Sequence, residues 1–199
     1  MGRDKLRLEV DGVPLLRRVY EALSDRCTEV VVVGEGGVPL EGARRIPDER
    51  PGAQGPLVGL EAGLAAVTNR LVFVAAGDMP FLHGNLVGYL LERLEERDAC
   101  TVVPRYRGRI HPLCAAYDRE ILPRVRAALD ERVRAVHRFL EVLDRVDYVE
   151  EGLRRFGDPD VILMNVNSPE DLDRARARGE PRREARREAR REAGREGAP

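Results

Sequence analysis

The sequence predicts an α/β fold in which a mostly parallel sheet carries helices on both faces. Two observations lead to this prediction. Short apolar runs alternate along the chain with stretches of helical periodicity, an order typical of parallel strands joined by crossover helices. The strongest run, residues 71–76, is uninterrupted and ends at Gly77, as expected for a strand buried on both faces.

The expected elements follow one another in order along the chain. Residues 14–26 are expected to form a helix, because their apolar side chains recur every three or four positions and Pro14 suits a first helical turn. The other helices are expected at residues 55–67, 86–97, 123–129 and 132–143, and a turn at 105–109. The strands are expected at residues 29–34, 44–47, 71–76, 99–103, 113–117, 145–149 and 161–164.

The last expected helix begins at Ser168, which can cap its first turn, with Pro169 in the first helical position. From Gly179 onward the sequence consists of Arg-Arg-Glu-Ala repeats without an apolar face that could dock. The sequence therefore predicts one domain over residues 1–178 and a charged, disordered tail over residues 179–199. An anion-binding role is the alternative for the tail.

Charge and cysteine content exclude several classes of function. The 34 basic and 35 acidic residues give a net charge of -1, but the segment from Arg174 onward holds ten Arg and five Glu. The rest of the chain is therefore acidic, with 24 basic and 30 acidic residues, which argues against a nucleic-acid groove. Three cysteines without Cys-x-x-Cys spacing, and no apolar run long enough for a membrane helix, predict a cytoplasmic protein with reduced thiols.

Asp78 is the strongest candidate for chemistry. It follows the best apolar strand, and ligands of open α/β sheets bind beyond the carboxyl ends of strands. Gly77 allows close approach of the backbone, and Pro80 stiffens the turn that aims the carboxylate. One carboxylate, together with waters and substrate phosphates, is a normal Mg²⁺ site. A capping or turn aspartate is the equally open alternative.

Two further segments could bind an anion. Residues 52–60 form a glycine-punctuated loop that leads into a helix N-terminus, which offers free N–H groups and the positive end of a dipole. Just upstream, Asp48 could accept hydrogen bonds from a sugar or a base. Lys5 would place a compact positive charge against phosphate oxygens. A structural turn and a solvated terminal lysine are the alternatives.

The remaining polar candidates lie further along the chain. His111 follows a basic run, Arg105-x-Arg107-x-Arg109, which could bind a second anionic substrate or form only a surface turn. Asn165 and Asn167 alternate, so both could point to one side of an extended segment, towards a ligand or metal. The histidines have no zinc-ligand spacing, and no Gly-x-Ser-x-Gly or Cys–His nucleophile pattern is present, so covalent catalysis is not expected.

Taken in this order, the segments resemble the molybdenum cofactor guanylyltransferase family. The matching segments, at the right spacing between Met1 and about Arg178, are Met1-Gly2-Arg3-Asp4-Lys5, Asp11-Gly12-Val13-Pro14-Leu15, Ile46-Pro47-Asp48, Gly55-Pro56-Leu57-Val58-Gly59-Leu60, Gly77-Asp78-Met79-Pro80-Phe81, His111-Pro112-Leu113 and residues 164–171, Met-Asn-Val-Asn-Ser-Pro-Glu-Asp. The resemblance implies a Rossmann-like nucleotidyltransferase fold that moves GMP from GTP onto molybdopterin and releases pyrophosphate. GTP and the molybdopterin cofactor would be the substrates, and other proteins of cofactor biosynthesis or molybdoenzyme chaperones would be partners.

The resemblance also implies roles for individual residues. Lys5 would contact the GTP phosphates, Asp48 the nucleotide, and Asp78 both Mg²⁺ and the nucleotide, which makes Lys5 and Asp78 the catalytic pair. His111, Asn165 and Asn167 would lie towards molybdopterin. The attacking group would be the phosphate oxygen of the substrate itself, so that no protein nucleophile is required.

Two departures from the family pattern bear on these expectations. The family carries a Leu-Ala-Gly-Gly strand and turn ahead of the position of Met1, so a first, central strand is expected upstream of Met1. Without this turn the triphosphate loses most of its backbone donors, and the chain as it stands is expected to bind GTP poorly. Gly34 stands where relatives often have an asparagine. The alternatives are a molybdopterin cytidylyltransferase, against which Pro56, Leu57 and Met79 argue, and a catalytically impaired relative that binds the cofactor or a partner.

Overall fold

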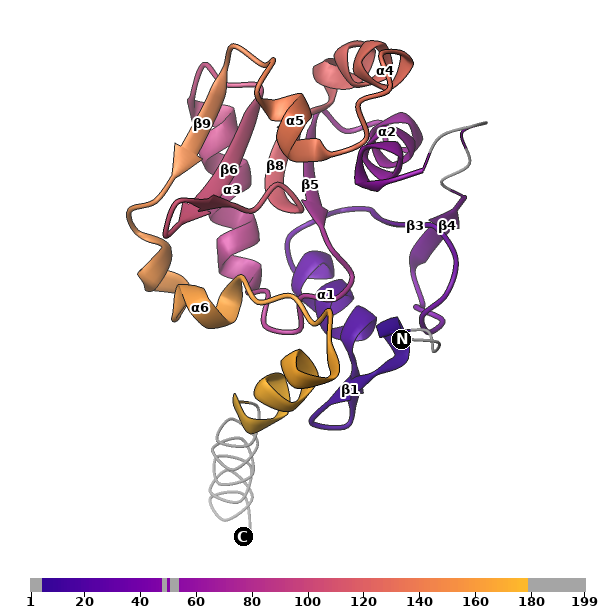
Figure 1. Ribbon diagram of the computed structural model, residues 1–199, viewed down its shortest axis with the longest axis vertical. Helices are drawn as coiled ribbons and strands as arrows, with labels where there is room; N and C mark the ends of the chain where they lie inside the picture. Colours follow the sequence, from indigo (N-terminus) through magenta and orange to yellow (C-terminus); the bar gives the residue numbers. More distant parts are fainter. Residues whose placement is uncertain (1–4, 48–49, 51–53, 179–199) are drawn as a thin grey trace, which may run out of the picture.

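The central sheet of the computed structural model is built from β5 (Leu71–Ala75), β8 (Cys114–Asp118) and β6 (Thr101–Tyr106), in that order (Figure 1). β7 (Arg109–Ile110) pairs with the end of β6, and β9 (Val146–Val149) pairs with its beginning. The structure describes residues 5–47, 50 and 54–178, and the statements below refer to these residues.

β5, β6 and β9 run in the same direction, as the prediction of a mostly parallel sheet expected, and β8 and the short β7 are the exceptions. β8 runs antiparallel to both β5 and β6, while β9 is parallel to β6. The reason is local. After β6 the chain reverses at Arg107 and Gly108, whose φ angles are 50° and 73°, and β8 therefore returns beside β6 without a crossover helix. The turn expected at residues 105–109, with no helix between the strands on either side of it, favours this reversal.

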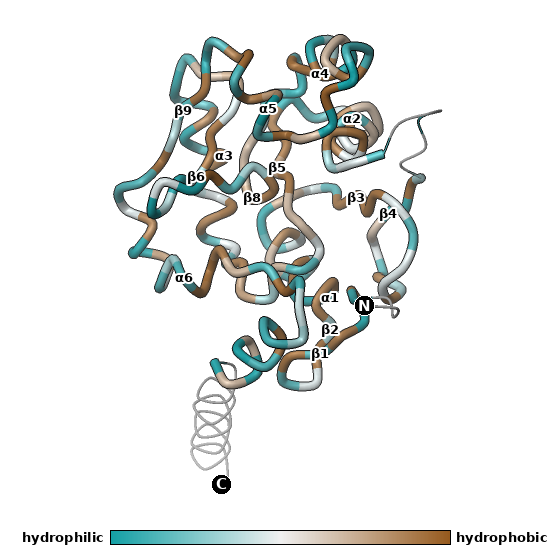
Figure 2. The backbone as a smooth tube through the Cα atoms, in the orientation of Figure 1, coloured by the Kyte–Doolittle hydropathy of each residue, from teal (hydrophilic) through white to brown (hydrophobic). Residues whose placement is uncertain are grey.

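A separate parallel pair is formed by β3 (Val30–Val33) and β4 (Ala43–Ile46), and both strands were expected from the sequence. Figure 2 shows β3 as a strongly hydrophobic segment. Among the described residues, no strand connects this pair to the central sheet.

Helices cover both faces of the central sheet, as predicted. On one face α2 (Pro56–Ala66), α4 (Leu122–Asp130) and α5 (Val136–Leu140) pack in one hydrophobic cluster. On the other face α1 (Leu15–Ser24) and α3 (Gly84–Glu96) pack in a second cluster. The buried side chains of β8 alternate between these clusters, with Ala115 and Tyr117 in the first and Cys114 and Ala116 in the second.

The N-terminal part forms a hairpin that the element predictions did not contain. β1 (Glu9–Val10) and β2 (Val13–Pro14) are joined by Asp11 and Gly12, with φ angles of 55° and 73°. Positive φ at both central residues is the condition for a type I′ turn, which Asp-Gly adopts readily. A short 3-10 turn, η1 (Lys5–Arg7), precedes the hairpin.

The hairpin packs against the other end of the chain. Val10 and Leu15 share a buried cluster with Phe81, Val166 and Leu172. Phe81 follows the end of β5, and Leu172 belongs to a helix that covers residues 169–178. This helix begins where Ser168 was expected to cap it. The cluster therefore gathers the start of the chain, the end of β5 and the last helix at one place, visible at the lower end of Figure 1.

One expected strand is a helix. Residues 161–164 were expected to be extended, but α6 spans Pro159–Ile162. The Asp158 side chain accepts a hydrogen bond from the Asp160 N–H, and Pro159 occupies the first helical turn, which together start a helix. The expected helix at 132–143 is also shorter, and two 3-10 segments complete the list, η2 (Arg119–Ile121) and η3 (Leu153–Phe156).

Two further expectations concern the state of the cysteines and the presence of a membrane-spanning helix. Cys27, Cys100 and Cys114 are free thiols, and the last two are buried. Burial raises the pKa of the Cys114 thiol to about 12. Among the described residues, no helix combines the length and the apolar character needed to cross a membrane.

Candidate active site

Asp78 lies directly beyond the end of β5, and its carboxylate is almost completely buried. One oxygen, Oδ2, accepts a hydrogen bond from Lys5 Nζ at 2.6 Å. The other, Oδ1, accepts from Asn165 Nδ2 at 3.2 Å. Both oxygens are therefore held by side chains that are far away in the sequence.

Lys5 stands between this buried carboxylate and solvent. Its ammonium also donates to Asn167 Oδ1 at 3.1 Å. The Lys5 side chain is 43% exposed, whereas that of Asp78 is 7% exposed. Lys5 is also the one lysine among 34 basic residues of the sequence. An ammonium is a compact point charge on a flexible stem, so it can bind a carboxylate and reach towards an anion in solvent.

The segment with the two asparagines is fixed by its backbone. Val166 N–H donates to the Asp78 carbonyl oxygen at 2.9 Å, so that this segment runs alongside the turn after β5. Asn165 and Asn167, on either side of Val166, then both reach the Lys5–Asp78 pair. The expectation that these asparagines point to one side of an extended segment is confirmed.

The start of the last helix holds this segment in place. Asp171 Oδ2 accepts the N–H groups of Asn167 at 3.0 Å and of Ser168 at 2.9 Å, and Ser168 Oγ accepts the N–H of Asp171 at 3.1 Å. This is a reciprocal capping box. These backbone N–H bonds, that of Asn167 foremost, lower the pKa of the Asp171 carboxyl. Asp171 was read from the sequence only as part of a helix start, and its role towards Asn167 was missed.

His111 belongs to the segment that runs beside the end of β5. The Leu113 carbonyl oxygen accepts the N–H of Ala76 at 2.8 Å, which joins the segment after His111 to the strand end that leads to Asp78. Burial, and secondarily the charge of Arg109, lower the pKa of His111 to about 4. The imidazole is therefore neutral at physiological pH.

Two further predicted contacts remain, Asp48 and the loop that leads into α2. Asp48 lies outside the described residues. At the start of α2, the Leu57 N–H donates to the carbonyl oxygen of Arg134 at 3.1 Å, and a Cβ on Gly55 would lie 3.1 Å from the same oxygen. Gly55 thus allows a close backbone contact within the protein, which supports the structural reading of this part of the loop.

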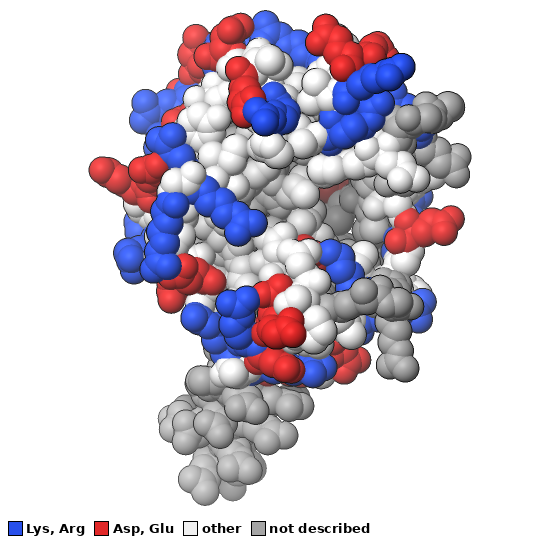
Figure 3. Space-filling view, in the orientation of Figure 1, with Lys and Arg blue, Asp and Glu red and all other residues white. Residues whose placement is uncertain are grey.

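The basic run before His111 has partners of its own. Arg105 is paired with Glu150 and lies over the Tyr148 ring, and Arg107 Nη2 is 3.0 Å from Asp160. In Figure 3 blue and red side chains are interspersed over the face in view rather than gathered by sign. The run therefore forms a surface hairpin with charges that are largely balanced, as the alternative interpretation predicted.

The group around Asp78 fits a hard divalent cation. Among the described residues, no three His, Cys, Asp or Glu side chains gather to form a complete metal site. Asp78 instead provides one carboxylate, with the amide groups of Asn165 and Asn167 beside it. The carboxylate already accepts a cation, the Lys5 ammonium. An oxygen-rich site of low ligand number suits Mg²⁺, which retains waters and takes further ligands from substrate phosphates.

Comparison with known proteins points to one family. The model of the MobA-like NTP transferase domain matches residues 1–146. A protein of Pelotomaculum thermopropionicum named "Probable molybdenum cofactor guanylyltransferase" is 38% identical over 189 residues, covering 90% of this chain and 87% of its own. The "Molybdenum cofactor guanylyltransferase" of Desulfosudis oleivorans is 28% identical, covering 88% and 87% of the two chains.

Solved structures agree on the fold. The molybdopterin-guanine dinucleotide biosynthesis protein A of Archaeoglobus fulgidus superposes with a TM-score of 0.73 at 26% identity, covering 88% of this chain and 90% of its own. The 2-C-methyl-D-erythritol 4-phosphate cytidylyltransferase of Thermus thermophilus gives a TM-score of 0.67 at 22% identity, covering 88% and 93%. The Rossmann-like nucleotidyltransferase fold is thus common to all three chains.

Proposed function

The chain belongs to the MobA-like NTP transferase family, and on this premise we propose that it transfers GMP from GTP to molybdopterin and releases pyrophosphate. It is an enzyme of the nucleotidyltransferase class, as its relatives are. The observation that carries the proposal is the pairing of Lys5 with buried Asp78 at the end of β5, beside Asn165 and Asn167.

The reaction needs no nucleophile from the protein. A phosphate oxygen of molybdopterin attacks the α-phosphorus of GTP, a new P–O bond forms, and the bond between the α-phosphorus and the bridging oxygen to the β-phosphate breaks. Pyrophosphate leaves with the bonding electron pair. The protein must hold two polyanions together against their mutual repulsion and stabilise charge as the bridging bond breaks.

Lys5 and Asp78 divide this task by charge. The half-exposed ammonium of Lys5 faces solvent and can exchange its carboxylate partner for phosphate oxygens. Asp78 then becomes available to hold Mg²⁺, which when bound supplies positive charge to the phosphate oxygens. Asn165 steadies the second carboxylate oxygen, so that the group remains oriented while its partner changes.

His111 and the two asparagines support the molybdopterin side of this proposal. The neutral imidazole of His111 can donate or accept one hydrogen bond without adding a charge. The amide groups of Asn165 and Asn167 offer both donors and acceptors at the same edge of the sheet. We also propose that the enzyme binds other proteins of cofactor biosynthesis or molybdoenzyme chaperones.

Of the alternatives, transfer of CMP is not favoured, because the relatives are named for guanylyl transfer. The experiment that tests the proposal incubates the chain with molybdopterin, Mg²⁺ and either GTP or CTP, and detects pyrophosphate and the dinucleotide product by mass spectrometry. We expect product from GTP supplied in large excess, because the chain as it stands is expected to bind GTP poorly. Product only from CTP would refute guanine specificity, and tight molybdopterin binding without product from either nucleotide would support the impaired relative.

Asp78→Asn is the matched variant for the metal role. The asparagine keeps the shape of the side chain and its contact with Asn165, but it loses the negative charge. We expect Mg²⁺-dependent product formation to fall by at least about 100-fold, the usual effect of removing one preorganised charge contact. Near-normal turnover would remove Asp78 from the proposed mechanism.

A further inference from the structure

The guanidinium of Arg18, on α1, binds the turn of the hairpin that follows η1. Its Nε and Nη2 atoms donate to the carbonyl oxygen of Val10 at 3.0 Å and 2.6 Å, and Nη2 also donates to Asp11 Oδ2 at 2.8 Å. The Arg18 side chain is 18% exposed. Hydrogen bonds from a charged group are stronger where they are shielded from water, so this contact restrains the hairpin firmly.

A second arginine reaches the neighbouring carbonyl group of β1. Arg176 Nε, on the last helix, donates to the carbonyl oxygen of Glu9 at 3.2 Å. The Arg176 side chain is 51% exposed, so water competes for this bond, and the contact of Arg18 is the stronger of the two. The hairpin is therefore held to α1 more firmly than to the last helix.

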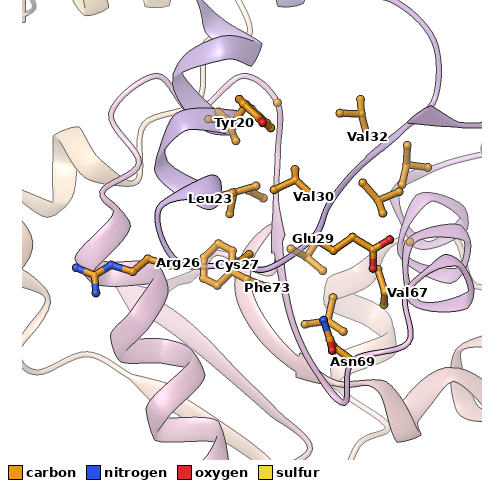
Figure 4. Close-up of a pocket in the computed structure, with 18 of the residues that line it drawn as sticks. Tyr20, Leu23, Arg26, Cys27, Glu29, Val30, Val32, Val67, Asn69 and Phe73 are labelled. Atoms are coloured by element: carbon orange, nitrogen blue, oxygen red, sulfur yellow. The ribbon is translucent and has the colours of Figure 1, made fainter. Parts of the chain in front are cut away.

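Arg18 lies on the side of α1 that faces the hairpin. The other side of α1 borders a cavity of about 650 Å³ between β3 and β5, and Figure 4 shows Tyr20 and Leu23 beside this cavity. Since successive residues of a helix are about 100° apart, Arg18 stands about 160° from Tyr20 and about 140° from Leu23 around the axis. The guanidinium is thus turned towards the hairpin and away from the cavity.

The backbone connects this restraint to Lys5. The Leu8 N–H donates to the carbonyl oxygen of Lys5 at 3.1 Å, and the Leu15 N–H donates to the carbonyl oxygen of Leu8 at 2.9 Å. Leu8 thus joins η1 to the first residue of α1 and directly precedes β1. A displacement of the hairpin would therefore move Leu8 and, with it, Lys5.

The same hairpin packs against the segments to which the Lys5 ammonium bonds. Val10 is fully buried in a cluster that contains Phe81 and Val166. Phe81 belongs to the turn that begins at Asp78, and Val166 stands between the two asparagines. The hairpin therefore sets the position of Lys5 relative to its partners in the site.

We propose that Arg18 is a positioning residue for Lys5. It fixes the carbonyl group of Val10, the hairpin then keeps its place, and η1 holds the ammonium between Asp78 and Asn167. The proposal rests on the proposed contact of Lys5 with the phosphates of GTP. Its physical basis is that a misplacement of about 1 Å in a reacting group can cost about 100-fold in rate.

The test compares Arg18→Met with a matched control, Arg93→Met. Both substitutions keep the apolar stem and remove a shielded guanidinium. Arg93 donates to Asp147 through Nε at 2.6 Å and Nη2 at 3.1 Å, and its side chain is 26% exposed. This pair joins α3 to β9, well away from β1 in Figure 1. The two variants should lose similar amounts of stability, so a difference between them at Lys5 reports position rather than stability.

The first readout is the rate at which Lys5 is acetylated in the folded protein without nucleotide. Peptide mass analysis follows this rate, because Lys5 is the one lysine of the sequence. We expect the rate to rise at least about threefold in Arg18→Met, as expected for the loss of a hydrogen-bonded restraint, and to stay unchanged in Arg93→Met. An unchanged rate in Arg18→Met, or an equal rise in both variants, would overturn the proposal.

The second readout is the dependence of product formation on GTP concentration, with molybdopterin and Mg²⁺ in excess. Because Lys5 contacts phosphates of bound GTP, we expect the KM for GTP to rise at least about fivefold in Arg18→Met while kcat falls less than about twofold. Arg93→Met should change neither constant. Faster acetylation with an unchanged KM would overturn the proposal. If the unmodified chain forms no product, the proposed function fails, and the acetylation rates alone decide whether Arg18 positions Lys5.

A milder variant covers the case in which Arg18→Met does not fold. Arg18→Gln keeps one amide donor, which can reach Val10 or Asp11 but not both. Measured against Arg93→Gln, it should give a smaller rise in the acetylation rate of Lys5. A rate equal to that of the unmodified protein would overturn the proposal.

Discussion

Replacing Lys5 with methionine should destabilise the protein and make its stability depend on Mg²⁺. The substitution keeps most of the length of the side chain but removes the cation 2.6 Å from Asp78 Oδ2. It leaves a carboxylate that is only 7% exposed with Asn165 as its partner. An uncompensated buried charge is costly, and a divalent cation can compensate it.

The magnitude follows from the burial of the two groups. Breaking a fully buried pair costs about 3–5 kcal/mol, and an exposed pair is worth about 0.2–1 kcal/mol. Because the Lys5 side chain is 43% exposed, solvent screens the interaction, and we expect a loss of roughly 1–2 kcal/mol in the free energy of unfolding. For a chain of this size that corresponds to a fall of about 3–6 °C in Tm.

Mg²⁺ should restore much of this loss in the variant. At ten times its dissociation constant, a bound ion stabilises a protein by about 1.4 kcal/mol. The unmodified protein should gain less, since the ion must displace the ammonium from Asp78. Thermal melting with and without MgCl₂ measures both effects.

The double variant Lys5→Met/Asp78→Asn is the control. It has neither the ammonium nor the carboxylate, so its Tm should not respond to Mg²⁺, and its loss of stability should be smaller than that of Lys5→Met alone. If Lys5→Met has the Tm of the unmodified protein and its Tm does not change with Mg²⁺, the ammonium is not paired with Asp78 in solution. The roles proposed above for Lys5 and Asp78 would then be wrong.

Three further predictions concern the same region. Because the lowered pKa of His111, about 4, lies below its unfolded value near 6.5, the unfolded chain binds a proton first and stability is lost as the pH falls from 6.5 towards 4. Allowing for partial exposure of the imidazole, the loss in the free energy of unfolding is roughly 1–2 kcal/mol. Urea titrations at pH 7 and pH 4.5 measure this loss, and it should be smaller in His111→Gln. Equal losses of stability in the two proteins would contradict the assignment to His111. Asp171→Ala should cost about 1 kcal/mol of stability and should weaken GTP binding in calorimetry, because Asn167 loses its backbone partner. Asp171→Glu can rebuild the capping box and should recover both properties. An unchanged GTP affinity in Asp171→Ala would show that the cap does not influence the site. GTP with Mg²⁺ should slow acetylation of Lys5, the one lysine of the sequence, which peptide mass analysis distinguishes from acetylation of the α-amino group. An unchanged rate would argue against a phosphate contact.

The sequence pointed to the residues around Asp78 for a physical reason. Asp78 could be found because an uninterrupted apolar strand that ends at a glycine and an aspartate fixes where the carboxylate emerges. Asn165 and Asn167 could be found because alternation alone places them on one side of an extended segment. These inferences depend on a few neighbouring residues.

The direction of β8 follows from a local feature, because the chain reverses at Arg107 and Gly108, within the turn expected at residues 105–109. The identity of short apolar runs is not local in this way. Residues 161–164 are as apolar as a strand, and the outcome was decided by the cap at Asp158 and by Pro159 just ahead of them. The Asp11-Gly12 hairpin was predictable from its dipeptide and was missed.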